Sequence, residues 1–236
     1  MPIHVRARPG EVAPIVLLVG DPGRARRTAE FLGGATCYNE FRGLLGYTGT
    51  FENVRVSVQT TGMGCPSAAI VYEELIQLGA RRLIRVGTCG ALQPEMRWAD
   101  TVIAMAATPS DQTALTYTGG EPHAPTADWA LVEAAVRVAR EQRARVHVGP
   151  IVSSDVFYDP DPDRPRRWRD RGHLAIEMEA SVLYTIAAIR RVAALTVLTV
   201  SDLITAETSK RISDQELKLG VDRMMVLAAG VAVAEV

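Results

Sequence analysis

The sequence alternates short apolar runs with longer segments of helical periodicity, and this alternation constrains the fold more than any other feature. Residues 15–19 form an apolar run that ends at a Gly-Asp-Pro-Gly turn, and residues 24–32 then have helical spacing. Strands and helices that alternate in this way form a largely parallel sheet with helices on both faces. The sequence therefore predicts an α/β fold of three layers, α/β/α, around a mixed, largely parallel central sheet.

The alternation continues to the C-terminus without an internal repeat, a low-complexity linker or a change of composition. A hairpin is predicted from residues 47–51 and 54–60, and Pro66 suits the first turn of a helix that ends near Gly79. Further strands are predicted at residues 83–86, 101–107, 147–152 and 193–200, and further helices at residues 127–144, 179–190 and 213–234. Residues 1–236 are therefore expected to form one domain.

Charge and composition exclude several classes of function. The 26 Lys and Arg residues are balanced by 27 Asp and Glu residues, so the chain lacks the basic field that binds nucleic acid or an anionic membrane. The three cysteines have neither the even number of a disulfide framework nor the spacing of a zinc site, and we expect no metal. No apolar segment is long enough to span a membrane and the N-terminus has no signal core, so we expect a cytoplasmic protein with a small-molecule ligand.

Two glycine-containing segments at predicted strand ends carry arginines suited to an oxyanion. Arg24 follows the turn that begins at Gly20, and Arg85 ends an apolar run, with Thr88 three residues later. Glycine lets backbone N–H groups approach an anion, and arginine supplies planar, permanently charged donors. Without a ligand, Arg24 would be a solvated residue on a helix face. Arg85 must find a counter-charge or stay in contact with water, because it ends a buried strand.

Carboxylates stand at two further strand ends. Glu177 and Glu179 flank Met178 at a strand-to-helix transition, and the alternation of side chains turns both carboxylates to one side. The helix dipole should keep Glu179 ionised and suited to accept hydrogen bonds from two vicinal hydroxyls, although Glu179 could also be an ordinary first-turn residue. Asp202 follows the apolar run that ends at Val200, where a carboxylate is either a helix cap or a group that protonates a leaving base.

Seven motifs, taken in order, carry a resemblance to a known family: GDPGR, FRGLLGYTGT, TGMGCPSAAI, RVGTCGAL, SSDVFY, EMEA and VSD. The chain resembles the hexameric purine nucleoside phosphorylases of the nucleoside phosphorylase-I superfamily over essentially its whole length. The resemblance implies phosphorolysis of a purine (2′-deoxy)ribonucleoside to the free base and (deoxy)ribose 1-phosphate, through an oxocarbenium-like transition state. Inorganic phosphate would be a co-substrate, and no cofactor is implied.

The resemblance assigns roles to individual residues. It places phosphate against Gly20, Arg24, Arg85 and Thr88, with Arg42 donated by the adjacent subunit. It places the ribose against Met178 and Glu179, with His4 of the neighbour at the 5′ position. It places the base against Phe157, Ser201 and Asp202, with Asp202 as the acid that serves purine N7. A homohexamer built as a trimer of dimers follows from this sharing, and a dimer is the minimum. Alone, His4 and Arg42 would be ordinary surface residues.

The chain also departs from the family pattern. The purine enzymes often place an arginine after the SD pair to help the aspartate, and no arginine aligns clearly there. Arg211 is a candidate for this role but is left out of the catalytic set. Uridine phosphorylases read uracil with a glutamine and an arginine after the FY pair, where this chain has residues 159–163, DPDPD. Pyrimidine specificity is therefore disfavoured. Nucleosidases use water and would not need three arginines around an anion.

Two alternatives remain open. Archaeal methylthioadenosine phosphorylases resemble the chain nearly as well, and they differ by an apolar 5′ pocket. A binding module that senses a nucleoside without turning it over would also retain the fold. The full set of Arg24, Arg85, Glu179 and Asp202 speaks against a silent module.

Overall fold

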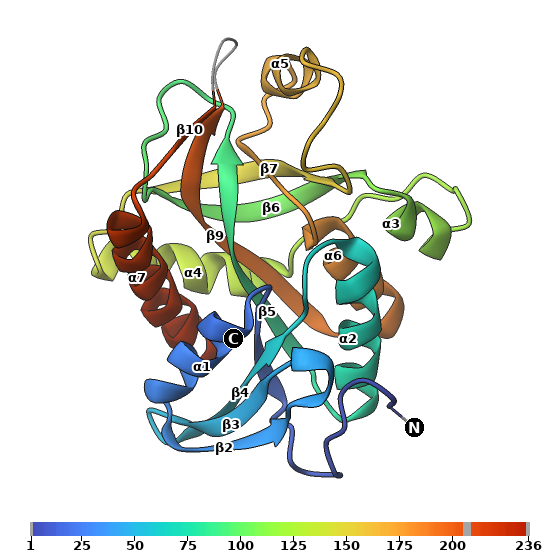
Figure 1. The fold of residues 1–236 in the computed structure, drawn as a ribbon, viewed down its shortest axis with the longest axis vertical. Helices are drawn as coiled ribbons and strands as arrows, with labels where there is room; N and C mark the ends of the chain where they lie inside the picture. The colour runs from blue at the N-terminus through green and yellow to red at the C-terminus, as the bar shows by residue number, and fades with distance from the viewer. Residues whose placement is uncertain (1, 205–208, 235–236) are drawn as a thin grey trace.

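The chain folds around one mixed β-sheet, and the structure, a computed structural model, describes residues 2–204 and 209–234 (Figure 1). The strands are β1 (Ile15–Val19), β2 (Gly33–Asn39), β3 (Gly46–Phe51), β4 (Val54–Thr60), β5 (Arg82–Ala91), β6 (Thr101–Ser110), β7 (Val146–Ser154), β8 (Ala175–Glu177), β9 (Ala193–Ile204) and β10 (Ser209–Arg211). The helices are α1 (Pro22–Glu30), the short 3₁₀ turn η1 (Phe41–Gly43), α2 (Cys65–Gln77), α3 (Gln112–Tyr117), α4 (Trp129–Glu141), α5 (Arg164–Asp170), α6 (Ala180–Arg190) and α7 (Asp214–Val233).

The sheet is partly closed on itself. Its strand order is β10-β9-β6-β7-β8-β5-β1-β4-β3-β2, and β5 also pairs with β9. Strands β5, β9, β6, β7 and β8 therefore form a ring, from which β1, β4, β3 and β2 extend. Among the described residues, five strand pairings are parallel and five are antiparallel. The predicted mixed sheet is confirmed, with more antiparallel pairing than the alternation suggested.

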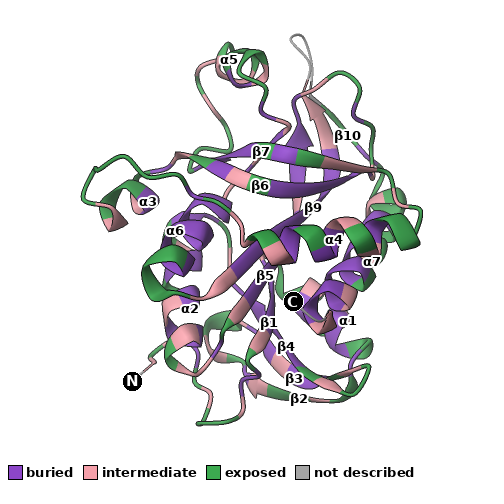
Figure 2. Cartoon of the chain, turned by 180° about the vertical axis from the view of Figure 1, so that it is seen from behind, coloured by how far each residue is buried: buried purple, intermediate pink, exposed green. Residues whose placement is uncertain are grey.

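Helices cover both faces of this sheet. One face packs against α2 and α6, which contribute fully buried side chains such as Tyr72 and Leu183. The other packs against α1, α4 and α7, with Leu131 and Met224 among the buried residues. Figure 2 shows the buried residues concentrated in the strands between the two helical layers, which is the predicted three-layer arrangement. Within residues 2–204 and 209–234, no helix is both long and apolar enough to cross a bilayer.

Most predicted elements lie where the sequence indicates, and the hairpin turn is the clearest case. Strands β3 and β4 pair in antiparallel fashion, and Glu52 and Asn53 between them have φ of 48° and 67°. This left-handed pair is typical of a two-residue turn that matches the twist of a hairpin. Strand β2 and helices α3 and α5 were not predicted, because their segments are short and lack a clear apolar period.

Four strands continue past their predicted ends: β5 to Ala91, β6 to Ser110, β7 to Ser154 and β9 to Ile204. The extensions of β5 and β9 pair with each other, with Gly90 opposite Asp202. Pairing between strands thus overrides the local sequence signal, which weakens at the glycines and polar residues. Asp202 consequently lies inside the end of a strand rather than after it, so the alternative of a helix cap is wrong.

Candidate active site

The centre of the site is a buried arginine held between two carboxylates. Arg85 on β5 is 4% exposed. Its Nε donates to Glu177 Oε2 at 2.8 Å, and its Nη2 pairs with Glu179 Oε2. Burial alone would lower the pKa of Arg85, but the charges of Glu179 and Glu177 outweigh it and raise the pKa. Of the two alternatives for Arg85, a counter-charge or contact with water, the structure shows the counter-charge, and both glutamates lie on the side of Arg85.

Glu177 was given no role by the sequence, yet it makes the most contacts in this cluster. Besides Arg85, its carboxylate accepts hydrogen bonds from Ser153 Oγ and from the backbone N–H groups of Glu179 and Ala180, the last two at 2.8 and 3.0 Å. Glu177 therefore fixes the corner between β8 and α6 and sets the positions of Arg85 and Glu179. The missing counter-charge of Arg85 was the sequence signal that pointed to it.

Glu179 occupies the cap position of α6 and is 4% exposed. Its Oε1 accepts a hydrogen bond of 2.5 Å from the backbone N–H of Gly64, which has a left-handed φ of 86° suited to glycine. Burial and then Glu177 raise the pKa of Glu179, against the opposing effect of Arg85. The ion pair with Arg85 and the hydrogen bond from Gly64 both favour the ionised form of Glu179, whereas burial opposes it.

Arg24 lies at the start of α1 and belongs electrostatically to the same cluster. Asp21 caps the helix by accepting a hydrogen bond of 2.8 Å from the Arg24 backbone N–H. Burial lowers the pKa of the Arg24 guanidinium, Asp21 and Glu179 raise it, and Arg85 lowers it. Arg24 is therefore close enough to interact electrostatically with both Arg85 and Glu179.

Glycines allow the strand ends to approach this region closely. A Cβ atom at Gly20 would lie 3.2 Å from the carbonyl oxygen of Gly62, and one at Gly87 would lie 2.9 Å from Nη2 of Arg85. A side chain at either position would displace the backbone or the guanidinium. Thr88, next to Gly87 on β5, is half-buried, so its hydroxyl remains within reach of solvent.

Asp202 stands at the end of β9, with its side chain 21% exposed. Ser201 Oγ donates to Asp202 Oδ2 at 2.7 Å. Strand β10 places Arg211 directly opposite Asp202, with 3.9 Å between Arg211 Nη1 and Asp202 Oδ1. The sequence offered Arg211 as a candidate to assist Asp202 but gave no register for the pair, because a nine-residue separation gives none without the strand pairing. Ser201 and Asp202 thus share one hydrogen-bonded unit.

Two further predicted residues have accessible side chains near strand ends. Phe157, after β7, is 68% exposed and packs edge-on against Tyr158, with 5.0 Å between ring centroids. Met178 is half-buried between Glu177 and Glu179. The Phe157 ring is therefore accessible from solvent.

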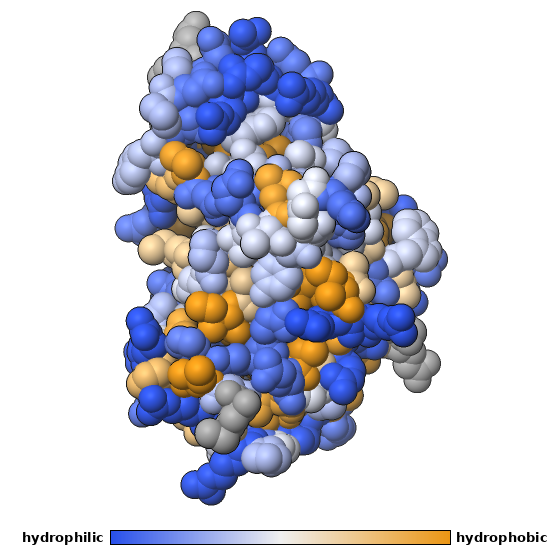
Figure 3. All heavy atoms as spheres, turned by 90° about the vertical axis from the view of Figure 1, so that its right-hand side faces the viewer, coloured by the Kyte–Doolittle hydropathy of each residue, from blue (hydrophilic) through white to orange (hydrophobic). Residues whose placement is uncertain are grey.

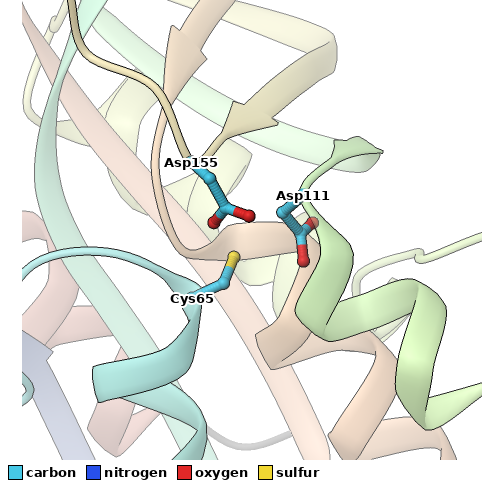
Figure 4. Close-up of side chains that lie close together, drawn as sticks. All are labelled: Cys65, Asp111 and Asp155. Carbon is cyan, nitrogen blue, oxygen red and sulfur yellow. The ribbon is translucent and has the colours of Figure 1, made fainter.

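A group of possible metal ligands lies next to the backbone of Met178. Cys65 Sγ and carboxylate oxygens of Asp111 and Asp155 lie within 4.8 Å of one another (Figure 4). Cys65 donates to the carbonyl oxygen of Met178 at 3.2 Å, and Asp111 accepts from Ser181 Oγ at 2.6 Å. Burial and then Asp111 raise the pKa of the Cys65 thiol, which favours the protonated form rather than the thiolate that binds metals. Cys65 therefore supports the Met178 backbone, whereas Asp111 and Asp155 accept hydrogen bonds from Ser181 and Gln112.

His4 and Arg42 do not join this cluster within the chain. His4 lies in the N-terminal segment against α2, and Arg42 lies in η1 between β2 and β3. In Figure 1, the N-terminus, β2 and β3 are at the lower end of the molecule, whereas β10, which pairs with the Asp202 end of β9, is at the top. Arg42 has a left-handed φ of 57°, a conformation that non-glycine residues adopt rarely and often at functional positions.

Comparison of the sequence with models of known protein families identifies the class of protein to which this fold belongs. Residues 14–234 match the family model described as the phosphorylase superfamily. The chain belongs to this superfamily.

Within this superfamily, the chain is similar over its full length to proteins that share one name. The chain is 45% identical over 236 residues to the DeoD-type purine nucleoside phosphorylase of Geobacillus kaustophilus (strain HTA426), covering 99% of this chain and 98% of that protein. It is 45% identical over 238 residues to the protein of the same name from Bacillus cereus (strain B4264). It is 44% identical to the one from Bacillus mycoides (strain KBAB4), and both Bacillus matches cover the whole of each chain.

Proposed function

We propose that the chain is a purine nucleoside phosphorylase, which uses inorganic phosphate to convert a purine nucleoside or deoxynucleoside to the free base and (deoxy)ribose 1-phosphate. The observation that carries the proposal is the buried Arg85, fixed between Glu177 and Glu179. Such a group suits a site that holds an anion next to a sugar. The full-length similarity to proteins of this name supports the purine as substrate. Phosphate is the co-substrate, and the proposal includes no other cofactor.

The phosphate site is assigned to Arg24, Arg85 and Thr88 together with the backbone at Gly20. Guanidinium groups bind phosphate oxygens through paired hydrogen bonds, and the open glycine backbone lets N–H groups approach. Arg42 of a neighbouring copy supplies a third guanidinium. Phosphate held below C1′ of the sugar stabilises the positive charge that develops there as the glycosidic bond breaks.

The nucleoside is assigned to the other strand ends. Glu179 accepts hydrogen bonds from the 2′ and 3′ hydroxyls, and Met178 contacts the same ring. Phe157 packs on the base, and Ser201 orients Asp202, which donates a proton to purine N7. Protonation neutralises the negative charge that the base would otherwise carry as it leaves, which is the role of a general acid.

We further propose that the protein is a cytoplasmic homohexamer active in purine salvage, in which His4 and Arg42 complete the neighbour's site. The proposal rests on the separation of these residues from Asp202 within the chain. The side of the molecule that carries α2 and the N-terminal segment has several apolar patches (Figure 3). Ile3 in the N-terminal segment is 65% exposed, Met63 in the loop before α2 is 82% exposed, and Ile70 on α2 is 43% exposed. Apolar surface of this kind is typical of a face covered by another subunit.

The test is a turnover panel with and without inorganic phosphate, using inosine, adenosine, guanosine, methylthioadenosine and uridine. We expect base release from the 5′-hydroxylated purine nucleosides, only with phosphate, and pentose 1-phosphate as the sugar product. Release without phosphate would identify a nucleosidase instead. A preference for methylthioadenosine or uridine would assign the substrate to those alternatives, and tight binding without turnover would identify a nucleoside sensor.

A further inference from the structure

A single buried carboxylate holds the N-terminal segment. Glu74 on α2 is 7% exposed. Its Oε1 accepts a hydrogen bond of 2.9 Å from the Ile3 backbone N–H, and its Oε2 accepts bonds of 2.8 and 2.6 Å from the backbone N–H groups of His4 and Val5. Val5 itself is completely buried in the core. Three consecutive N–H groups therefore converge on one carboxylate, and the backbone on either side of His4 is fixed.

The same carboxylate also contacts the ring of His4. Glu74 Oε1 lies 2.9 Å from His4 Nδ1. The backbone hydrogen bonds from Val5 and Ile3 outweigh the effect of burial and lower the pKa of Glu74, so the group is an ionised acceptor at neutral pH. An ionised carboxylate can only accept hydrogen bonds, so Nδ1 must carry the ring proton. In a neutral imidazole, Nε2 is then a hydrogen-bond acceptor.

Nε2 is available for a molecule outside the chain. The His4 side chain is 25% exposed, and Nε2 makes no hydrogen bond within the described residues. A second set of contacts connects this segment to the turn that carries Arg42. The Arg6 backbone N–H donates to Asn39 Oδ1 at 3.0 Å, and the Arg6 guanidinium lies 3.3 Å above the centroid of the Phe41 ring. His4 and Arg42 are therefore presented on segments that contact each other.

We infer that Glu74 is a positioning residue that fixes His4 with Nε2 as an acceptor and thereby selects nucleosides that carry a 5′-hydroxyl in the neighbouring copy's site. This inference rests on the proposed function, in which His4 reaches the ribose of the neighbour. A 5′-hydroxyl can donate to Nε2, whereas a 5′-deoxy carbon or a 5′-thioether cannot. A site built around such an acceptor disfavours both analogues, because the acceptor is left without a partner.

The experiment compares kcat/KM for inosine and 5′-deoxyinosine in the whole protein and in Glu74→Gln. The amide of this variant can place its NH₂ group against Nδ1, which moves the ring proton to Nε2 and removes the acceptor. We expect wild type to prefer inosine by about tenfold or more, as for one lost hydrogen bond. In Glu74→Gln, we expect this preference to fall to about twofold or less, through a loss on inosine and little change on 5′-deoxyinosine.

The matched control is Glu73→Gln. Glu73 is the adjacent residue on α2, and its carboxylate pairs with Arg190 at the surface, with 2.9 Å between Oε2 and Nε. This variant should keep the wild-type preference. The His4→Ala variant should already have lost the preference for inosine over 5′-deoxyinosine. Adding Glu74→Gln to His4→Ala should change the ratio of the two kcat/KM values no further.

The outcomes separate this inference from the function on which it rests. If wild type releases no base from inosine with phosphate, the proposed function fails. If wild type turns over inosine but Glu74→Gln lowers kcat/KM equally for both substrates, Glu74 has a structural role only and the inference is overturned.

If Glu74→Gln does not fold, the inference can still be tested by observing the tautomer of the His4 ring directly in the wild-type protein. In ¹⁵N NMR spectra of histidine-labelled wild type, with the His4 signals assigned by their loss in His4→Ala, we expect a protonated Nδ1 and an unprotonated Nε2. A protonated Nε2 in the neutral ring would overturn the inference without any variant of Glu74.

Discussion

The surroundings of Arg85 and of His4 both use buried carboxylates, but in different ways. Around Arg85, guanidinium and carboxylate groups are buried at converging strand ends and satisfy one another within the chain. Around His4, a buried carboxylate holds a surface segment, and the Nε2 atom of the ring has no hydrogen-bond partner among the described residues. The first region pairs its charges internally, whereas the second fixes a side chain that is partly exposed at the surface. The difference shows that a buried carboxylate can either neutralise a buried guanidinium or orient a surface residue.

The largest expected effect comes from removing the centre of the buried region. Arg85→Ala leaves Glu177 and Glu179 buried without their counter-charge, so the free energy of unfolding should fall by about 3–5 kcal/mol. The rate of phosphorolysis should fall by about 10²–10³-fold or more, since a charged donor to the phosphate is lost. Urea denaturation at fixed protein concentration and initial rates at saturating phosphate measure the two effects. Arg81→Ala, an exposed arginine beside β5, is the control and should change stability by less than about 0.5 kcal/mol.

The next effect tests Asp202 as the acid. Asp202→Asn cannot donate a carboxyl proton to N7, so phosphorolysis of adenosine should slow by about 10²–10⁴-fold. A nucleoside methylated at N7 already carries the positive charge and should be affected much less. Initial rates on both substrates give the comparison. Equal losses on the two would remove Asp202 from the acid role.

Subunit mixing tests whether the outward-facing region serves a neighbour. Arg42→Ala and Asp202→Asn should each be nearly inactive alone. In a mixed dimer, one of the two sites would contain both native residues. Random pairing of equal amounts makes about half of the dimers mixed, so co-assembly should restore roughly a quarter of wild-type activity. The measurement is the rate of base release after joint refolding or co-expression. Separately purified variants combined without subunit exchange are the control, and no recovery after co-assembly would place Arg42 and Asp202 in the same chain's site.

The smallest effect concerns the pH dependence of stability at Glu74. Its pKa in the folded protein is lowered from 4.5, because backbone N–H groups of Val5 and Ile3 favour the ionised form more than burial opposes it. A carboxylate with a lowered folded pKa stabilises the protein fully above its unfolded pKa, and this contribution is lost as the pH falls through the folded value. The stability difference between wild type and Glu74→Gln should therefore shrink as the pH falls below 4.5. Thermal unfolding across this range measures it, and a difference that grows on acidification would contradict the assignment.

The sequence predicted the layers of the fold and most of the elements, because apolar runs and helical periods are local signals. It also predicted that Arg85 needs a counter-charge and that Glu177 and Glu179 point to one side. It did not predict the closure of the sheet through β5 and β9, which depends on pairing between distant strands. For the same reason, it missed the extension of β9 through Asp202.

The residues that the sequence missed act through contacts between distant segments. Glu177 looked like half of a symmetrical pair, and only the folded chain shows that it holds the backbone of Glu179 and Ala180. Arg211 was a candidate without a clear alignment, and only β10 shows that it lies opposite Asp202. Glu74 stands in an ordinary helical pattern, 70 positions along the chain from His4, and it accepts a hydrogen bond from the His4 backbone N–H. No spacing rule connects residues at such separations.

The central claim is that Arg24 and Arg85 bind one phosphate ion beside a sugar held by Glu179, in a site shared by two copies of the chain. A crystal structure of the assembled protein with phosphate and a non-hydrolysable purine nucleoside analogue tests it most directly. We predict a phosphate ion in contact with both guanidinium groups and with Arg42 from the adjoining copy, and ribose hydroxyls on Glu179. Phosphate bound elsewhere, or Arg24 and Arg85 directed to separate surfaces, would contradict the account.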